Sequence, residues 1–338
     1  MFEPSAKSHV RFRAVGAFIA IALLSVGAMH TAGAAQSGLA YDELTKLQGG
    51  DQPAPQPGTF NDDFQAAVDA ANAAANAPQH HGLFGGIQNA AEKARGALEQ
   101  FKTGFATRLY FMNGWERIDS LATQTATITK PNLHQVIQLD LAKKTYQITD
   151  TSAQPMTQTQ PYQPPGPPGP PPPSPQPGTG KLDIRVSTAV LGPKTIDTVS
   201  TTGYSVDFKA TETKSTGSCT DGTFETSVVE YLSSYAEPQM GPTSHAKIGP
   251  MPKLPMGSPM GLKAGCSPTT TMHASGGASE PSGRLSLWTF VTLKGSAQTS
   301  QGSAGGGFST LIERGHVRAL GAADASLFEI PSDFTKAQ

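Results

Sequence analysis

The chain has 338 residues, of which 36 are glycine, 28 are proline and only 15% are charged. This composition indicates that much of the length is turn, loop or linker, so the folded part is shorter than the chain. Lys and Arg number 25 and Asp and Glu number 26, a balance that gives no electrostatic reason to bind nucleic acid or an anionic membrane.

Residues 1–35 have the pattern of a secretory signal. An uncharged run rich in Ala, Val, Ile and Leu covers residues 14–28 and is followed by small residues up to Ala35. The run is short for a membrane span, which needs about 20 residues. Three basic residues precede it: Lys7, Arg11 and Arg13. We therefore expect a periplasmic or secreted protein with no membrane span after cleavage, and a retained N-terminal anchor is the alternative.

Residues 36–60 show no sustained periodicity, and their Gly, Gln and Pro content predicts a flexible arm. A helix start follows at residues 61–63, where Asn and two Asp residues suit the positive end of a helix. The stripe of this helix is mostly alanine, so we expect it to bury little surface. A second helix is predicted over residues 85–100, which makes residues 61–103 an Ala-rich helical segment. The pair His80-His81 between the helices is more typical of a solvated loop than of a metal site.

From residue 104 the period changes from helix to strand. The stretch "RLYFMNGWERID" places two β-prone runs around Asn113-Gly114, a pair that favours a type I′ hairpin. Further strands are predicted near residues 123–129, 135–139, 145–149, 182–187, 204–208, 224–232, 284–293, 308–313 and 317–320. The run 284–293 is apolar at successive positions, which predicts a strand covered on both sides.

The strands follow one another without intervening helices, which favours a mainly β fold with N-terminal helices, built on an antiparallel sheet that is curved or closed. Two insertions interrupt this β domain of residues 104–338. The Pro-rich insertion 155–178 favours polyproline II or a solvated segment, and the insertion 236–283 is rich in Met, Pro and Gly.

The second insertion contains five of the nine methionines of the chain, four of them at Met240, Met251, Met256 and Met260. Methionine is flexible and suits adaptable binding surfaces, so these four residues are candidates for a flap over an apolar ligand. A plain loop is the alternative. A third possibility is a Cu(I) site, because thioethers suit that ion. Its ligands would be Met251, Met256, Met260, His245 and His273. We predict no bound cofactor.

Two cysteines, Cys219 and Cys266, are present in a chain with a secretory signal. An even cysteine count in an oxidising compartment predicts one disulfide, and the spacing of a redox or zinc motif is absent. The sequence also has no nucleophile elbow, zinc-protease motif, P-loop or dinucleotide fingerprint. These observations favour a protein that is not an enzyme.

Several short motifs recur in a recognisable order: "GWERIDS", "QLDLAKKTYQITD", "PKTIDTVSTTGYSVDF", "LWTFVTL" and "ASLFEIPSDFTK". This order resembles a family of secreted bacterial domains known as domain of unknown function 4412, over residues 104–338. Such domains are similar to the lipoprotein carriers of the LolA/LppX-like superfamily. The resemblance implies a curved antiparallel sheet or half-barrel whose concave face accommodates lipid, and it carries over no catalytic residues.

Three functions compete at this point. The first is a non-enzymatic binding or carrier-like module for an apolar, lipid-like ligand, with the methionine segment as a flap. The second is a structural scaffold of the cell envelope that contacts another envelope protein through the Pro-rich insertion. The third is Cu(I) binding by the Met-rich segment. Sequence leaves the ligand and the oligomeric state open.

The C-terminal stretch "DASLFEIPSDFTKAQ" is unusually apolar for a chain end. We expect Leu327, Phe328 and Ile330 to dock on the sheet. Pro331 is predicted to stop further strand pairing, because proline cannot donate a hydrogen bond to a ladder.

Overall fold

The computed structural model describes residues 38–49, 53–75, 96, 100, 102–152, 177–238, 265–278, 280–299 and 302–337. All of them belong to one compact unit of the chain, Gln36–Gln338. The predicted signal, the His80-His81 pair and most of the second predicted helix lie outside these residues. Among the described helices, none is both long and apolar enough to cross a membrane.

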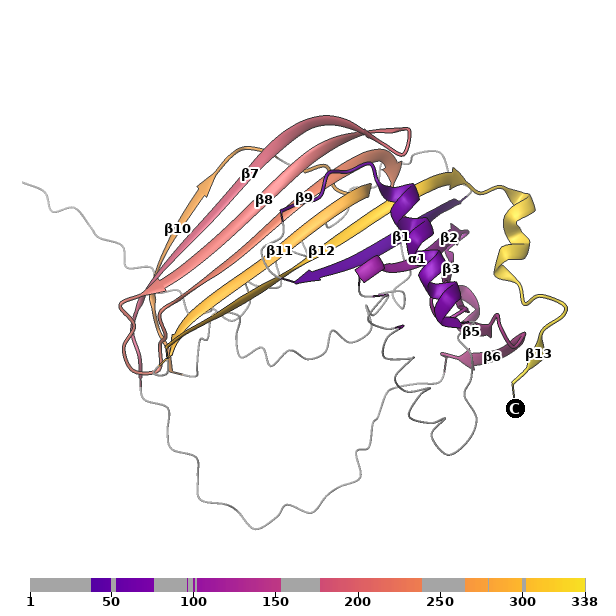
Figure 1. The fold of residues 1–338 in the computed structure, drawn as a ribbon, viewed down its shortest axis with the longest axis horizontal. Coiled ribbons are helices and arrows are strands. Elements are labelled where there is room, and N and C mark those ends of the chain that lie inside the picture. Colours follow the sequence, from indigo (N-terminus) through magenta and orange to yellow (C-terminus); the bar gives the residue numbers. More distant parts are fainter. Residues whose placement is uncertain are drawn as a thin grey trace, which may run out of the picture. The chain divides into compact units, whose positions relative to one another are not determined.

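Thirteen strands form one curved, unclosed sheet in the order β10-β7-β8-β9-β11-β12-β1-β2-β3-β4-β5-β6-β13 (Figure 1). Neighbouring strands are antiparallel except at the two edges, where β10 runs parallel to β7 and β13 runs parallel to β6. The predicted mainly β fold and curved antiparallel sheet are confirmed, and the sheet is open rather than closed.

Strand β1 (Leu39–Gly49) lies in the middle of this sheet, between β12 and β2. The prediction of a flexible arm over residues 36–60 is therefore wrong for this segment. Its polar side chains weaken the local strand pattern, because they pair with residues elsewhere in the sequence. Glu43 pairs with Arg314 at 2.8 Å, and Lys46 pairs with Asp63 at 2.8 Å.

On one side of β1 the sheet consists of a meander of short strands, which we call the short-stranded half. It contains β2 (Phe105–Met112), β3 (Trp115–Ser120), β4 (Thr125–Lys130), β5 (Gln135–Asp140) and β6 (Thr145–Asp150), with the 3-10 turn η1 (Pro131–Leu133) before β5. The predicted hairpin is confirmed, since Asn113 and Gly114 both have positive φ angles, of 54° and 78°, as a type I′ turn requires.

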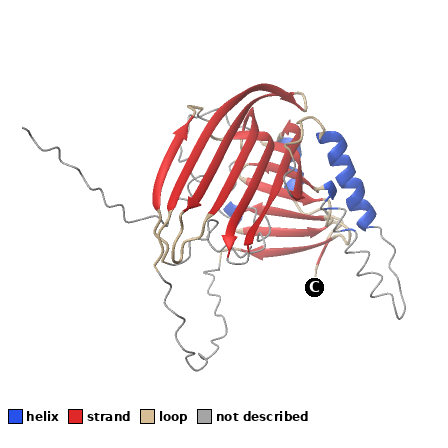
Figure 2. Cartoon of the chain, turned by 60° about the vertical axis from the view of Figure 1, so that its left-hand side comes forward, coloured by secondary structure: helices blue, strands red, loops and turns tan. Residues whose placement is uncertain are grey.

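On the other side lies the long-stranded half. Its strands are β7 (Lys181–Ile196), β8 (Val199–Thr213), β9 (Gly222–Ala236), β11 (Arg284–Thr299) and β12 (Gly302–Ala319), and the short strand β10 (Thr269–Ser275) forms its edge. In Figure 2 these long strands run side by side, and the helix of the N-terminal region stands at the right.

Two sequence predictions fail in the long-stranded half. The predicted strand pair 308–313 and 317–320 is one continuous strand, β12, which accommodates an extra residue opposite Ala40 and Asp42 of β1. The predicted insertion 236–283 contains strand β10, whose polar sequence gives little strand signal. The prediction for residues 284–293 is confirmed at its start, where the consecutive residues Leu285 to Trp288 are all buried.

Helix α1 (Phe60–Ala75) packs on β1 and β2. Phe60, Phe64, Ala67 and Ala71 are buried against Leu44 and Ala106. The prediction that this helix buries little is wrong, because two phenylalanines at its start add to the alanine stripe. Gly315 of β12 lies beneath Phe60, and a Cβ atom there would collide with the ring.

The C-terminal segment forms the 3-10 helix η2 (Ala322–Phe328) and the two-residue strand β13 (Thr335–Lys336). Phe328 is fully buried, and Leu327, Ile330 and Phe334 pack around the same cluster, so the predicted docking is confirmed. Arg117 also donates to the carbonyl of Leu327 at 2.7 Å. The prediction that pairing stops at Pro331 is wrong: the chain turns after it and β13 then pairs with β6.

Candidate ligand-binding face

Residues that pair across neighbouring strands point to the same side of a sheet, and neighbours along one strand point to opposite sides. Leu44 packs against α1 and pairs with Glu313 of β12, which pairs with Trp288 of β11. These three residues share the side that carries α1, which we call the helix face. Their chain neighbours Ile312 and Thr289 therefore point to the opposite side.

The opposite side of the long-stranded half carries apolar side chains in successive rows. One row across five strands reads Val186, Phe208, Thr226, Leu293, Phe308, and the next reads Thr188, Val206, Val228, Val291, Thr310. We call the apolar residues of this side the apolar face: Ile184, Val186, Val206, Phe208, Phe224, Val228, Val291, Leu293, Phe308 and Ile312. All ten are half-buried, whereas core residues such as Leu44 and Leu287 have no exposed surface.

Near the row that contains Leu293 the helix-face side of the strands is polar, whereas farther along it carries the apolar residues Val229, Phe290 and Leu311. Ser227, Thr292 and Lys294 alternate along β9 and β11 with the residues of the apolar face. Lys209 of β8 and Glu225 of β9 form an ion pair of 2.6 Å there. At this row the strands therefore have one wet side and one apolar side.

Three large apolar side chains at the margins of the apolar face are exposed. Leu47 is 44% exposed, Val190 is 56% exposed and Met272 is 66% exposed. Their partners Thr310, Tyr204 and Ile184 place them on the apolar side of the sheet. These side chains extend the apolar face at its margins, and large exposed apolar surfaces often mark a ligand-binding or interaction site.

Ionisable groups occupy the apolar side of the sheet where the long strands meet β1. The Arg314 guanidinium donates to Glu43 at 2.8 Å and to the carbonyl of Ser286 at 3.0 Å, and it lies over the Tyr41 ring at 5.5 Å. Burial raises the pKa of Tyr41 above its usual range. We call this group the Arg314 cluster. The cluster places charged and polar side chains at one end of the apolar face.

Two carboxyl groups beside the Arg314 cluster have strongly raised pKa values. Burial raises the pKa of Glu230 to about 8, helped by a hydrogen bond to the Glu280 carboxyl. Burial alone raises the pKa of Glu116 to about 7, and its Oε1 atom has no hydrogen-bond partner among the described residues. Glu116 pairs across the ladder with Phe111, which stacks on Tyr41. Both acids therefore hold or release a proton near neutral pH.

Sequence reasoning missed these residues, because they come from four separate strands. The only local signal is a charged residue at an apolar-side position, such as Glu230 in "ETSVVEYL" and Arg314 in "LIERGH". A charge at such a position signals either a buried ion pair or a site. Only the register of the strands brings these groups together.

The helix face holds a second group of buried polar atoms. Glu313 is 2% exposed, and its pKa is raised to about 7 by burial and by the nearby Asp63 carboxylate, against the opposing effect of Lys46. The Oε2 atom of Glu313, the Oγ atom of Ser309 and the Nε1 atom of Trp288 have no hydrogen-bond partner within the described part of the chain.

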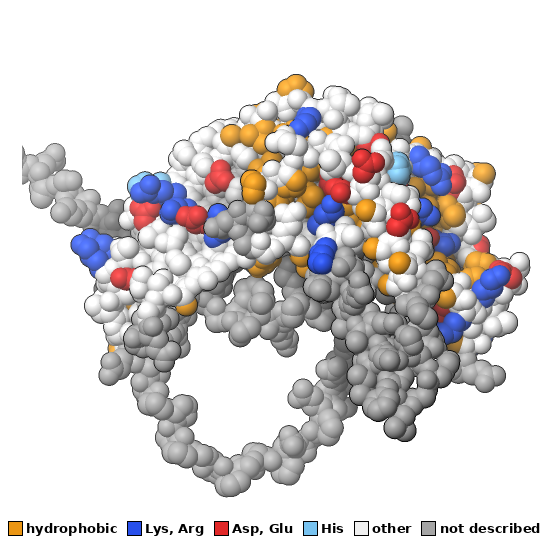
Figure 3. All heavy atoms as spheres, in the orientation of Figure 1, with side chains coloured by type: hydrophobic (Ala, Val, Ile, Leu, Met, Phe, Trp, Pro, Cys, Tyr) orange, Lys and Arg blue, Asp and Glu red, His pale blue; other side chains and the backbone are white. Residues whose placement is uncertain are grey.

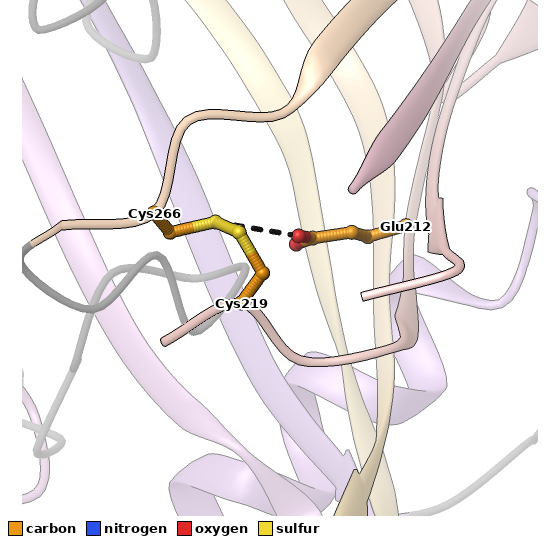
Figure 4. Close-up of side chains that lie close together, drawn as sticks. All are labelled: Glu212, Cys219 and Cys266. Carbon is orange, nitrogen blue, oxygen red and sulfur yellow. Dashed lines mark hydrogen bonds between the residues drawn. A yellow bond between two sulfur atoms is a disulfide. The ribbon is translucent and has the colours of Figure 1, made fainter. Parts of the chain in front are cut away.

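The predicted disulfide is confirmed: Cys219 and Cys266 are bonded and link the turn after β8 to the start of β10 (Figure 4). The Glu212 carboxylate lies 3.4 Å from the Cys266 sulfur. The three side chains are close enough to hold a metal ion, but both sulfurs are consumed by the disulfide and cannot act as thiolates. This cluster is structural.

Most of the predicted flap and copper ligands lie outside the described residues, namely Met240, Met251, Met256, Met260 and His245. His273 is exposed on β10, and its Nε2 atom is 3.3 Å from the Asp183 carboxylate. The flap and the copper site therefore remain predictions.

A hollow of about 430 Å³ lies at the glycine-rich ends of β11 and β12. Its lining is polar and small: Thr223, Glu225, Lys294, Gly295, Ser296, Gly305, Gly306 and Gly307. Glu225 and Lys294 place it on the helix-face side, away from the apolar face. It lacks the apolar walls that an acyl chain needs.

The visible surface in Figure 3 shows a hydrophobic patch near its middle, with Lys, Arg, Asp and Glu side chains of both signs scattered around it.

Comparisons with protein-family models, with curated proteins and with solved structures find no match for this chain.

Proposed function

We propose that this chain is a non-enzymatic binding module that acts outside the cytoplasm and holds an apolar, lipid-like ligand against its apolar face. One observation carries the proposal: five adjacent long strands present ten apolar side chains on one side, all half-buried. The disulfide supports an oxidising compartment. The motif order that resembles lipoprotein carriers supports the same class of ligand.

The dimensions of the apolar face suit an extended acyl chain. Neighbouring strands are about 4.8 Å apart, so a row that crosses five strands is about 20 Å long. Each methylene group that leaves water on such a surface contributes about 0.8 kcal/mol. An acyl chain that lies along a row would gain most of its binding free energy from the removal of its methylene groups from water.

The Arg314 cluster supplies a place for the polar group of an amphiphile. Glu230 follows Val228 by two residues along β9, so both point to the same side of the sheet. Arg314 lies two residues beyond Ile312 on β12 in the same way. A ligand whose chain covers Val228 and Ile312 would thus place its head group near ionisable side chains.

The direct test removes the apolar character of the middle row while keeping β-branched residues. The variant Val206→Thr/Val228→Thr/Val291→Thr changes three neighbouring strands, and binding of a polarity-sensitive dye and of a fatty acid is measured by fluorescence and native mass spectrometry. We expect affinity to fall by about tenfold or more, because three apolar contacts are replaced by hydroxyls.

The matched control adds methyl groups to the other side of the same sheet. Thr211 and Thr223 pair across β8 and β9 on the helix-face side, so Thr211→Val/Thr223→Val should leave binding unchanged. If wild-type protein binds neither dye nor fatty acid, or if the triple variant binds as well as wild type, the proposal is wrong.

A further inference from the structure

Strand β10 forms one edge of the sheet, and all seven of its residues are exposed. Its sequence, "TTTMHAS", contains no Lys, Arg, Asp, Glu or Pro. Its pairing with β7 runs without a bulge from Thr269 to Ser275. Natural proteins protect edge strands with charges, prolines, bulges or covering segments. None of the first three devices is present in β10, and the exposure of all seven residues indicates that no segment of the described residues covers it.

The free hydrogen-bonding groups of β10 belong to alternate residues. Thr269 donates its N–H to the carbonyl of Gly180 at 2.9 Å, toward β7. In a parallel pair the N–H and C=O of one residue point the same way and alternate along the strand. Thr270, Met272 and Ala274 therefore direct their N–H and C=O groups outward.

The other edge of the sheet is partly closed. Strand β13 pairs with Thr145 and Tyr146 of β6, and the ion pair of Lys144 with Asp333, at 2.8 Å, holds this terminus in place. Pairing of β10 with β6 of another copy would build an open array, whereas pairing of β10 with itself closes after two copies. A closed dimer suits a sheet that has one unprotected edge and one edge partly covered by β13.

We propose that two copies of this chain pair antiparallel through their β10 edges, with the two-fold axis at Met272. In this register Met272 of one copy lies opposite Met272 of the other, and Thr270 lies opposite Ala274. Outward-pointing groups then meet outward-pointing groups in all three pairs, and no charged side chains face each other across the new ladder.

The register also accounts for the exposure of Met272. Met272 is 66% exposed and pairs with Ile184, so it continues a row of the apolar face. In the dimer the two Met272 side chains cover each other, and the apolar faces of both copies join into one surface.

The start of β10 is fixed before any partner arrives. The Cys219–Cys266 disulfide lies three residues before Thr269, and Ser267 donates to the carbonyl of Gly178 at 3.0 Å. A strand held in this way loses less conformational freedom on pairing than a free one. The pairing is independent of the ligand proposed above, so either proposal can fail without the other.

The self-opposed position of Met272 allows a charge-swap test. The full oxidised chain and its Met272→Lys and Met272→Glu variants are compared by sedimentation equilibrium over a range of concentrations. Each variant places like charges directly opposite each other, so we expect its dimer dissociation constant to rise by about tenfold or more. An equimolar mixture of the two variants should restore the wild-type constant through opposite charges.

The control Ser296→Lys places the same charge on an exposed residue of β11, away from both edges, and should dimerise like wild type. Three results would overturn the proposal: a wild-type chain that stays monomeric, oligomers that grow without limit as concentration rises, or a mixture that associates no better than the single variants.

Discussion

The two halves of the sheet share antiparallel pairing but differ in strand length and in the burial of their apolar side chains. In the short-stranded half the strands have six to eight residues, and the helix face is covered by η2 and α1. In the long-stranded half the five long strands have 15 to 18 residues, and the apolar face stays half-buried. Residues of the short half such as Ile128 and Leu139 are buried completely or nearly so.

The contrast separates stability from binding. Fully buried apolar side chains contribute the most to folding, because they lose all contact with water. Half-buried rows contribute less and leave surface for a partner. The short-stranded half therefore holds the more fully buried apolar core, and the long-stranded half carries the apolar face that we propose as a binding platform.

The largest effect is expected from removing the C-terminal segment. Truncation after Ala325 deletes Leu327, Phe328, Ile330 and Phe334, and should lower the free energy of unfolding by about 5 kcal/mol or more, since loss of one buried Phe side chain alone costs about 3 to 5 kcal/mol. Urea unfolding measures the loss. The control, truncation after Phe334, removes only exposed β13 and should cost about 1 kcal/mol. Equal stability of both truncations would show that η2 is no anchor.

The disulfide should matter next, and mainly in the long-stranded half. Its cysteines are 47 residues apart in the sequence. Replacing both by serine should cost about 4 kcal/mol in the chain-entropy model. Hydrogen exchange should rise in β10 and in the turn between β8 and β9, and stay unchanged in β2 to β6. Faster exchange spread evenly over both halves would contradict the separation.

Glu313 lies on β12 beside the central strand β1 and should make stability depend on pH. Its folded pKa, about 7, is above the unfolded value near 4.5, so the folded state holds the proton more tightly and its stabilising effect is lost as pH rises between these values. Glu313→Gln should raise the free energy of unfolding by about 2 kcal/mol at pH 8 and change it little at pH 4.

The control for this pH dependence is Glu225→Gln on the polar side of β9, whose carboxylate is 41% exposed. Unfolding curves at pH 4 and pH 8 compare the two variants. A control that flattens the pH dependence as much as Glu313→Gln does would contradict the assignment to Glu313.

The smallest effect on stability is expected from the apolar face itself. The variant Val206→Thr/Val228→Thr/Val291→Thr changes half-buried residues and should cost about 1 kcal/mol in total. Ile128→Thr alone, at a position with no exposed surface, should cost about 2 to 3 kcal/mol. Thermal unfolding checks the ranking. If the triple change costs more than Ile128→Thr, the apolar face is core rather than platform.

Much of the sheet could be predicted from local patterns. Alternation of apolar and polar residues located most strands, and Asn113-Gly114 located the hairpin. Strand β1 was missed, because Glu43 and Lys46 find their partners only in β12 and α1. Strand β10 was missed because its stability comes from its neighbour β7 and the disulfide, not from its own sequence.

The sequence predicts a class of ligand, but not the surface that we propose to hold it. An apolar ligand was expected from the one-sided strands and the family resemblance, and the methionine segment was expected to hold it. The methionine segment stays a prediction, and the apolar face depends on the register of five strands, which a single sequence does not reveal. The Arg314 cluster needed the same register, since Glu43 and Arg314 are 271 residues apart.

The most direct test of the binding platform places a reporter on each side of one strand. Val228 belongs to the apolar face, and its neighbour Ser227 points to the other side. Tryptophan is introduced at either position, and its fluorescence is followed as a brominated fatty acid is added. Binding to the apolar face predicts strong quenching in Val228→Trp and little in Ser227→Trp. Equal quenching at both positions, or none at either, would contradict it.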